Sequence, residues 1–121
     1  MRPRRFMYGN KYHATRINSA DGMFDSALEY KRWCYLKVLE AGGEIKDLKR
    51  QVPFVLIPTQ RKDGKVLFRE CKYVADFVYT DKNGVEHIED TKGIVLDVFK
   101  IKQKLFYYFY HKEIEIVKKW T

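Results

Sequence analysis

The chain has 121 residues, of which 45% are hydrophobic and 16% aromatic, which suits one globular domain with a core and argues against a disordered chain. Twenty-four Lys and Arg against 16 Asp and Glu leave a net charge of +8, which points to a polyanionic partner, although plain solubility is an alternative reason for it. No apolar run approaches the roughly 20 residues that span a bilayer, and the first residues lack the apolar segment of a signal peptide, so we expect a cytoplasmic protein.

The cysteines and histidines predict neither a disulfide framework nor a zinc site. Cys34 and Cys71 are too few for such a framework and lie among apolar residues, so we expect them to be reduced and buried. His13, His87 and His111 have no metal-ligand spacing among themselves or with the cysteines. The sequence also contains no Gly-rich phosphate loop and no Gly-x-Ser-x-Gly motif.

The chain begins with a basic arm, residues 1–12, and continues as a single domain, residues 13–121. The basic residues of the arm are Arg2, Arg4, Arg5 and Lys11. Thr15–Phe24, with a turn at residues 20–22, predicts a short hairpin.

A first helix is predicted over Ala27–Ala41 and is ended by a pair of glycines. Ser26–Glu29 reads as a capping box, in which the Ser hydroxyl and the Glu carboxylate satisfy free amides of the first turn. On a helical wheel Glu29 lies on the same side as Trp33 and Leu36. An inward orientation of its carboxylate is therefore an equal alternative to the capping role. Apolar residues occur on most sides of the helix, and one stripe consists of Ala27, Tyr30, Cys34, Val38 and Ala41. We therefore expect a helix packed between other elements.

Strands are predicted next. Ile45–Ile57 reads as one or two strand pieces interrupted by Pro53, which belongs at an edge or a bulge. A turn at residues 61–64 leads into a strand at Val66–Arg69. The segment Tyr73–Gly93 then reads as a hairpin, because runs of Val, Phe, Tyr and Ile flank a turn at residues 81–84 with the sequence DKNG.

The type of this turn decides which charged side chains share a face. With a two-residue type I′ loop, Asp76 would pair with Thr91, and Asp90 and Lys92 would face the other way. A type I turn that starts at Asp81 and ends with a glycine in the left-handed region suits DKNG better, and it places residue 76 opposite residue 90. The two carboxylates would then lie about 4.5–5.5 Å apart at their Cβ atoms, with the lysine on the same face.

Two opposed carboxylates repel each other, so a bound cation is the natural remedy. The (D/E)-x-K spacing carries no weight alone, because it occurs six times in the chain, but only Asp90–Lys92 follows an apolar strand with its own Asp. The alternative is a surface hairpin whose charges form cross-strand pairs. Glu89 falls on the opposite face and is expected to be solvated or ion-paired.

A second helix is predicted over Asp97–His111, followed by a final strand at Glu113–Lys118. The residues expected to pack on the sheet are Val98, Ile101, Leu105, Tyr108 and Phe109. A separate polar stripe consists of Lys100, Lys104, Tyr107 and His111.

Asp76, followed by Asp90-Thr91-Lys92, a glycine and a helix, resembles the PD-(D/E)XK nuclease superfamily, and within it a family of small phage-encoded proteins described as a domain of unknown function. The likeness runs from about Lys11 to Ile116. Its pieces are KYHA, FDSALEYKRW, GEIKDLKRQVPF, YVADF, EDTKG and KIKQKLFYYFY. FDSALE also resembles the start of transposase-type and mismatch-repair-type nucleases, in which a helix-borne Glu joins the metal site. Ala75 stands where a Pro is usual, but that Pro is often absent in the superfamily.

This resemblance implies an Mg²⁺-dependent deoxyribonuclease, with Mn²⁺ as an alternative ion. Asp76, Asp90 and the Thr91 carbonyl would hold the metal, and Lys92 would position water or stabilise the transition state. Glu29 would be a further ligand, or only a helix cap. Gln51 matches a recurring site Gln, although a strand Gln more often satisfies neighbouring backbone. DNA would be bound by Arg4, Arg5 and Lys11 of the arm and by Lys100 and Lys104 of the second helix.

The expected fold is α/β: a central mixed β-sheet flanked by α-helices, a restriction-endonuclease-like core, with a basic N-terminal arm. The expected function is metal-dependent endonucleolytic cleavage of DNA in phage recombination, replication or processing. Many relatives act as dimers or with partners, so a homodimer or a phage or host partner protein is also implied. The rival hypotheses are a non-catalytic nucleic-acid-binding module and a basic scaffold that never meets DNA.

Overall fold

The computed structural model describes residues 16–121. The basic arm of residues 1–12, and with it Arg4, Arg5 and Lys11, lies outside the described residues. The elements in chain order are β1 (Ile17–Ser19), β2 (Gly22–Phe24), α2 (Ala27–Ala41), β3 (Ile45–Ile57), β4 (Gln60–Lys62), β5 (Lys65–Phe68), β6 (Cys71–Asp81), β7 (Glu86–Thr91), α3 (Asp97–Tyr110) and β8 (Glu115–Val117).

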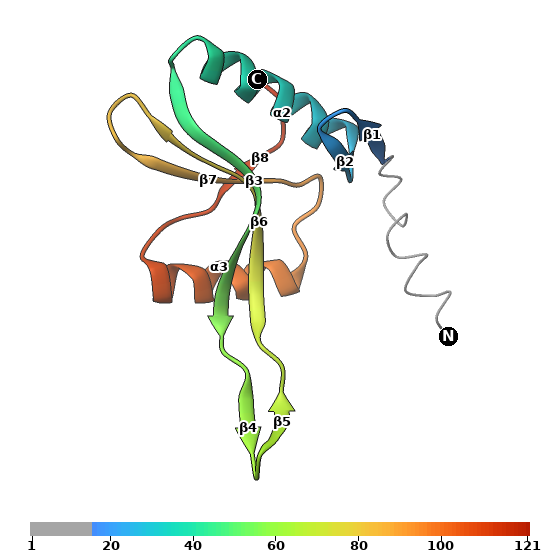
Figure 1. Cartoon of the computed structure of the whole chain (residues 1–121), viewed down its shortest axis with the longest axis vertical. Coiled ribbons are helices and arrows are strands. Elements are labelled where there is room, and N and C mark those ends of the chain that lie inside the picture. Colours follow the sequence, from blue (N-terminus) through green and yellow to red (C-terminus); the bar gives the residue numbers. More distant parts are fainter. Residues whose placement is uncertain (1–15) are drawn as a thin grey trace.

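The central sheet has four strands in the order β3-β6-β7-β8. β3 pairs with β6 and β6 with β7 in antiparallel fashion, whereas β8 returns after α3 to pair with β7 in parallel. The expected α/β class with a mixed sheet and two helices is therefore confirmed. Figure 1 shows α2 beside the β1–β2 hairpin at one end of the sheet and α3 farther along it. No helix among residues 16–121 combines the length and the apolar character that a bilayer crossing requires.

Each helix packs on its own cluster of buried side chains. The α3 cluster consists of Leu56, Tyr73, Ala75, Val78, Ile88, Phe99, Phe106 and Ile114. The α2 cluster consists of Phe24, Trp33, Leu36, Ile45, Phe77 and Tyr79. Because β6 supplies residues to both clusters, this strand ties the two halves of the core together. Fully burying one such Phe or Leu side chain contributes about 1.5–3 kcal/mol.

The β6–β7 turn has the type I geometry with a following left-handed glycine, as predicted. Gly84 has a φ of 82°, and its N–H donates to the Asp81 carbonyl at 3.0 Å. The Asp81 N–H donates to the Val85 carbonyl at 2.9 Å, and the Asp81 side chain accepts from the Asn83 N–H at 2.8 Å. The register pairs Val78 with Ile88. The type I′ alternative is thus excluded, and position 76 falls opposite position 90.

Most predicted elements are confirmed. The first hairpin forms as β1–β2, and α2 begins and ends where the sequence predicted. Residues 45–57 form one strand rather than two pieces, and Pro53 lies on the edge strand β3, where its missing N–H does no harm. α3 ends at Tyr110, because His111 takes a left-handed conformation with a φ of 56°.

The predicted apolar stripe of α2 was wrong. The buried residues of α2 are Glu29, Trp33 and Leu36, whereas Val38 is 69% exposed. The helix is covered on one side only, so its second apolar stripe faces outward. For the same reason Cys34 is exposed, contrary to expectation, while Cys71 is partly buried.

The face of α3 that packs on the sheet was also predicted wrongly. Phe99 and Phe106 are its buried residues, and Leu105 is only partly buried. Four members of the predicted packing face are at least half exposed, namely Val98, Ile101, Tyr108 and Phe109. Apolar residues occur nearly all round this helix, so their helical period alone does not determine which face is buried. The rings of Phe99 and Phe106, seven residues apart, fill the space over β6.

The β4–β5 hairpin projects beyond the rest of the domain (Figure 1). Its strands continue the directions of β3 and β6, and every residue of both strands is exposed. The turn between them is tight, because Asp63 and Gly64 have φ values of 53° and 77°. The predicted turn and strand in this region are therefore confirmed, but as an extension outside the core.

Candidate functional site

Asp76 and Asp90 lie beside each other in the centre of the sheet. Asp76 is carried by β6 and Asp90 by β7, one step beyond the paired residues Phe77 and Glu89. Asp90 is 3% exposed. Burial first, and then the adjacent Asp76 carboxylate, raise the pKa of Asp90 to about 8. The repulsion predicted from the sequence is therefore present in the folded chain.

The carboxylate of Asp76 is held by hydrogen bonds from β7. Its Oδ2 accepts from the Thr91 N–H at 2.8 Å and from the Thr91 hydroxyl at 2.9 Å. Its Oδ1 accepts from Nε2 of Gln51 at 3.3 Å. These donors fix the orientation of the carboxylate while leaving lone pairs of both oxygens for a ligand.

Gln51 connects Asp76 to Glu29. Its Nε2 donates to Glu29 Oε2 at 3.0 Å as well as to Asp76. Gln51 also has a φ of 55°, which places this non-glycine residue of β3 in the left-handed region. Such a conformation costs about 1–3 kcal/mol and persists only where the surroundings impose it. The strained backbone of β3 thus carries the amide that joins two carboxylates.

Glu29 lies at the start of α2 with its carboxylate turned inward. The Ser26 hydroxyl accepts the Glu29 N–H at 3.1 Å, so the Ser half of the capping box is formed. The Glu29 side chain itself is buried and reaches Gln51. Burial, followed by the charges of Asp76 and Asp25, raises the pKa of Glu29 to about 7, and Arg50, whose Nη2 lies 3.6 Å from Oε2, opposes the rise.

Two further groups contact Asp90. Nζ of Lys92 lies 3.5 Å from Asp90 Oδ2 and 4.7 Å from the centre of the Phe99 ring. The hydroxyl of Tyr73 donates to the same Oδ2 at 3.1 Å. Burial and the Asp90 charge raise the pKa of Tyr73, so this phenol stays protonated and acts as a donor. The sequence reasoning missed Tyr73; its position on the same strand as Asp76 was the only available signal.

These side chains line one cleft of about 540 Å³. Its lining residues are Asp25, Gln51, Lys72, Tyr73, Val74, Asp76, Asp90, Lys92, Ile94, Leu96, Val98, Phe99 and Lys102. Asp76, Asp90, Lys92 and Gln51 therefore meet as expected, and Glu29 joins them through Gln51. Lys72 and Lys102 are cations of this cleft that the sequence did not single out.

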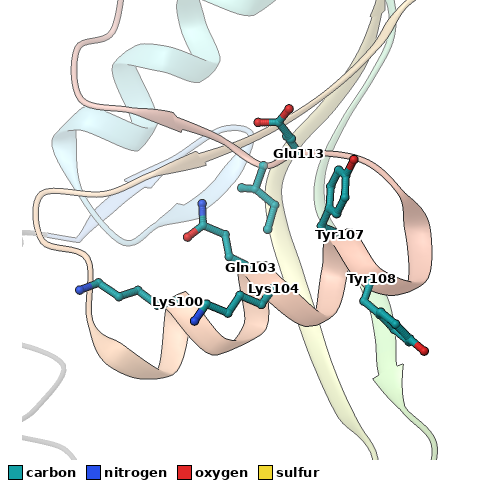
Figure 2. Close-up of a pocket in the computed structure, with 7 residues that line it drawn as sticks. Lys100, Gln103, Lys104, Tyr107, Tyr108 and Glu113 are labelled. Atoms are coloured by element: carbon teal, nitrogen blue, oxygen red, sulfur yellow. The ribbon is translucent and has the colours of Figure 1, made fainter.

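Lys100 and Lys104 line a different pocket, of about 700 Å³, between α3 and the segment that leads to β8. Figure 2 shows both lysines projecting from α3, with Tyr107 directed toward Glu113. Both lysines therefore lie outside the carboxylate cleft. Because α3 is rotated relative to the prediction, Lys102 faces the carboxylate cleft instead.

Glu89 forms a separate buried network on the other side of β7. The carboxylate is 1% exposed and accepts two hydrogen bonds from Arg32 of α2, at 2.8 and 2.6 Å, and one from the hydroxyl of Tyr79. Of the two expected states, solvated or ion-paired, the second is therefore confirmed, in a buried setting. The network joins α2 to the central sheet.

Whether the cleft suits a metal depends on its donors. In the part of the chain that the structure describes, no group of three or more His, Cys, Asp or Glu side chains is close enough to hold an ion. Asp76 and Asp90 form a pair, and Glu29 is held one amide away by Gln51. Mg²⁺ is commonly bound by one or two carboxylates and keeps waters that a phosphate replaces. The adjacent carboxylates of Asp76 and Asp90, which repel each other when both are ionised, fit such an ion.

One comparison with known proteins gives a match. A family model described as "Protein of unknown function (DUF1064)" matches residues 9–121. No curated protein and no solved structure matches significantly.

Proposed function

The chain belongs to the DUF1064 family, and from that premise we propose that it is a metal-dependent DNA endonuclease with a PD-(D/E)XK, restriction-endonuclease-like core. It would act in the cytoplasm on phage DNA during recombination, replication or processing. One observation carries the proposal: an amide, two carboxylates and a lysine, supplied by β3, β6, β7 and the residue after β7, line one cleft. These residues are Gln51, Asp76, Asp90 and Lys92. A third carboxylate, that of Glu29 at the start of α2, is joined to them through the Gln51 amide.

The repulsion within the carboxylate pair supports a divalent cation. Asp90 is buried beside Asp76, and the neighbouring Lys92 ammonium, 3.5 Å away, is one positive charge against the two. Asp76 and Asp90 would hold Mg²⁺ or Mn²⁺, with the Thr91 carbonyl as a backbone donor and Glu29 as a ligand of bound water. When bound, the ion would supply Lewis-acid stabilisation of a phosphate and acidify a nearby water.

The chain's own residues have separate roles. Asp76 is oriented by Thr91 and Gln51, so its carboxylate keeps one direction without rearrangement during the reaction. Tyr73 donates to Asp90 and stays protonated. Lys92 has its ammonium over the Phe99 ring, which limits its movement, and it would stabilise negative charge that develops on the phosphate. Lys72 and Lys102 would neutralise flanking phosphates of the bound strand.

The proposal is tested by nuclease assays with Mg²⁺, Mn²⁺ or EDTA on duplex, single-stranded and branched DNA. We expect metal-dependent cutting that is lost in Asp76→Asn and Lys92→Ala. Cutting that persists in both variants would place the activity elsewhere and remove the proposal.

The second candidate is a non-catalytic nucleic-acid-binding module, favoured by the net charge of +8. DNA binding with a steep salt dependence and no cutting of any substrate, with either ion, would establish that alternative. Calorimetric titration with Mn²⁺ separates the two directly, because the nuclease requires an ion site that depends on Asp76 and the binding module does not.

A further inference from the structure

The β4–β5 hairpin carries an unusual density of unpaired positive charge. Residues 60–72 contain five basic side chains, Arg61, Lys62, Lys65, Arg69 and Lys72, and two acidic ones. Within residues 16–121 none of the five makes a salt bridge, although Lys82, Lys92, Lys100 and Lys112 all do. Five basic side chains against two acidic ones, with none of the five in a salt bridge among the described residues, give this segment a net positive surface that suits a polyanion.

The hairpin has no packing role in the domain. Every residue of β4 and β5 is exposed, including the large apolar side chains Val66, Leu67 and Phe68. An isolated two-stranded hairpin is marginally stable in water. Figure 1 shows it projecting past α3 as a continuation of β3 and β6. An extension of this kind makes sense as a contact surface for something outside the domain.

The position of the hairpin ties it to the cleft. β6 contains Asp76, and β3 contains Gln51, so the two strands that carry the cleft residues lead directly into the hairpin. Lys72 lines the cleft itself, and Arg69, Lys65 and Lys62 follow toward the tip. The cations therefore follow one another along the chain from the cleft to the tip, across the short break between β6 and β5.

The reach of the hairpin matches duplex DNA. Gly64 at the tip is twelve residues before Asp76, and a chain of that length spans at most about 40 Å at about 3.3 Å per residue. One turn of B-DNA is about 34–36 Å long. A hairpin with a reach of this order follows a duplex for about one turn from the site of cutting, whereas a nucleotide or a short peptide would need no such reach.

We propose that the β4–β5 hairpin is a DNA-gripping arm, in which Arg61, Lys62 and Lys65 bind backbone phosphates of a duplex about one helical turn from the carboxylate cleft. The exposed apolar residues Val66 and Phe68 contact sugars or the groove between those phosphate contacts. The inference rests on the proposed nuclease function, because it takes DNA as the substrate of the cleft. It assigns the length of duplex that the protein needs and the residues that hold its far end.

The test compares two variants with the same loss of charge. The arm variant is Arg61→Gln/Lys62→Gln/Lys65→Gln, and the control is Lys46→Gln/Lys118→Gln/Lys119→Gln, which removes three exposed cations outside the arm and the cleft. Both are made in Lys92→Ala protein, so that the DNA is not cut during the measurement. Binding to labelled duplexes of 10 and 25 base pairs is followed by fluorescence anisotropy in the presence of Mg²⁺ at several salt concentrations. Thermal unfolding checks that each variant is folded.

We expect the arm variant to bind the 25-base-pair duplex at least tenfold more weakly, with a salt slope lower by about 2–3, since each lost phosphate contact removes about 0.9 from the slope. The control variant should bind the 25-base-pair duplex less than twofold more weakly than its parent. Its salt slope should be unchanged. The parent protein should prefer the 25-base-pair duplex to the 10-base-pair duplex, and the arm variant should lose that preference. Equal losses in both variants, or none in either, would overturn the arm.

Three other outcomes are also decisive. If Val66→Ser/Phe68→Ser turns a dimer into a monomer in sedimentation experiments while the affinity for DNA is unchanged, the hairpin is a protein interface and the DNA-gripping arm is wrong. If arm-dependent DNA binding is found but wild-type protein never cuts DNA, the arm holds and the nuclease proposal fails. If wild-type protein cuts DNA, and the same three arm substitutions made in protein that keeps Lys92 leave cutting and binding unchanged, the arm fails and the nuclease proposal holds.

Discussion

Glu89 and Asp90 are consecutive acidic residues of β7 whose buried carboxylates have opposite electrostatic environments. Glu89 receives a bidentate interaction from the Arg32 guanidinium. Asp90 lies beside the Asp76 carboxylate, with the Lys92 ammonium 3.5 Å away. The Glu89 carboxylate is thus neutralised within the protein, whereas the Asp90 carboxylate keeps a second carboxylate as its neighbour.

Removing the charge of Asp90 should stabilise the metal-free protein. In Asp90→Asn the amide oxygen can still accept from Tyr73, whereas the repulsion from Asp76 is gone. We expect the free energy of unfolding in EDTA at pH 8 to rise by about 1–2 kcal/mol, as is common when a strained active-site charge is removed. Urea unfolding measures this change. Asn83→Asp, in the exposed turn, is a control for a change of one charge and should move stability by less than about 0.5 kcal/mol.

The same charges predict how stability depends on pH. The pKa values of Asp90, about 8, and Glu29, about 7, are above those of unfolded chains. The folded state therefore binds more protons than the unfolded state between about pH 4 and 8, so stability falls as pH rises through this window. Urea unfolding in EDTA at pH 5, 6, 7 and 8 should show the fall.

Saturating Mn²⁺ should reverse this trend, because the ion binds the ionised carboxylates of the folded protein and its effect increases with pH. The control concerns His87, which contributes in the same direction: partial burial lowers its pKa, but the hydrogen bonds to Asp81 and Glu115 raise it overall. His87→Gln should leave most of the slope, and Asp90→Asn should remove most of it. A slope that depends on His87 alone would contradict the electrostatic account of the cleft.

Lys92 should be needed for cutting and not for folding or for ion binding. Lys92→Ala removes one positioned cation, and losing one such group typically lowers the rate about 10²–10³-fold. The midpoint of thermal unfolding should change little, because the ammonium is partly exposed. Single-turnover cleavage and Mn²⁺ titration measure the two effects separately. Lys118→Ala, an exposed lysine near β8, serves as the control and should cut at the wild-type rate.

The sequence predicted the carboxylate pair because a single local feature, the type of the β6–β7 turn, determines it. The DKNG turn, with Asp81 first and Gly84 left-handed, sets the β6–β7 register, and the register sets which side chains oppose each other. Tyr73, Lys72 and Lys102 were not predictable in this way. Their place in the cleft depends on which side of α3 packs against β6, and this is decided by contacts between distant segments.

The helix faces show the same limit. In α3, Val98 and Ile101 repeat at helical spacing as well as Phe99 and Phe106 do, and only the shape of the space over the sheet selects the Phe pair. In α2, by contrast, Glu29 was expected to share a side with Trp33, and it does. Periodicity therefore identifies helices well and their buried face poorly when apolar residues surround the axis.

The role of the Gln51 side-chain amide should be separable from the strain of the Gln51 backbone. In Gln51→Gly the left-handed φ is no longer costly, so stability should be kept or rise slightly, while the link between Glu29 and Asp76 is lost. Gln51→Ala loses the same amide and keeps the strain, so it should be less stable than Gln51→Gly by about 1 kcal/mol. We expect both to cut DNA about tenfold more slowly or worse. If both cut at the wild-type rate, the Gln51 bridge is structural only.

The buried pair on the other side of β7 should govern stability and leave the cleft intact. Arg32→Met removes the partner of Glu89, which then keeps only the Tyr79 hydroxyl in a site that is 1% exposed. Leaving a buried charge without its partner typically costs about 3–5 kcal/mol. Arg32→Met/Glu89→Leu should recover much of that loss, because no uncompensated charge remains. Urea unfolding measures both values, and Mn²⁺ titration of the folded fraction should give wild-type affinity in the double variant. Loss of ion binding in that variant would mean that Glu89, rather than Asp90, belongs to the metal site, and the assignment of the two carboxylates would have to be exchanged.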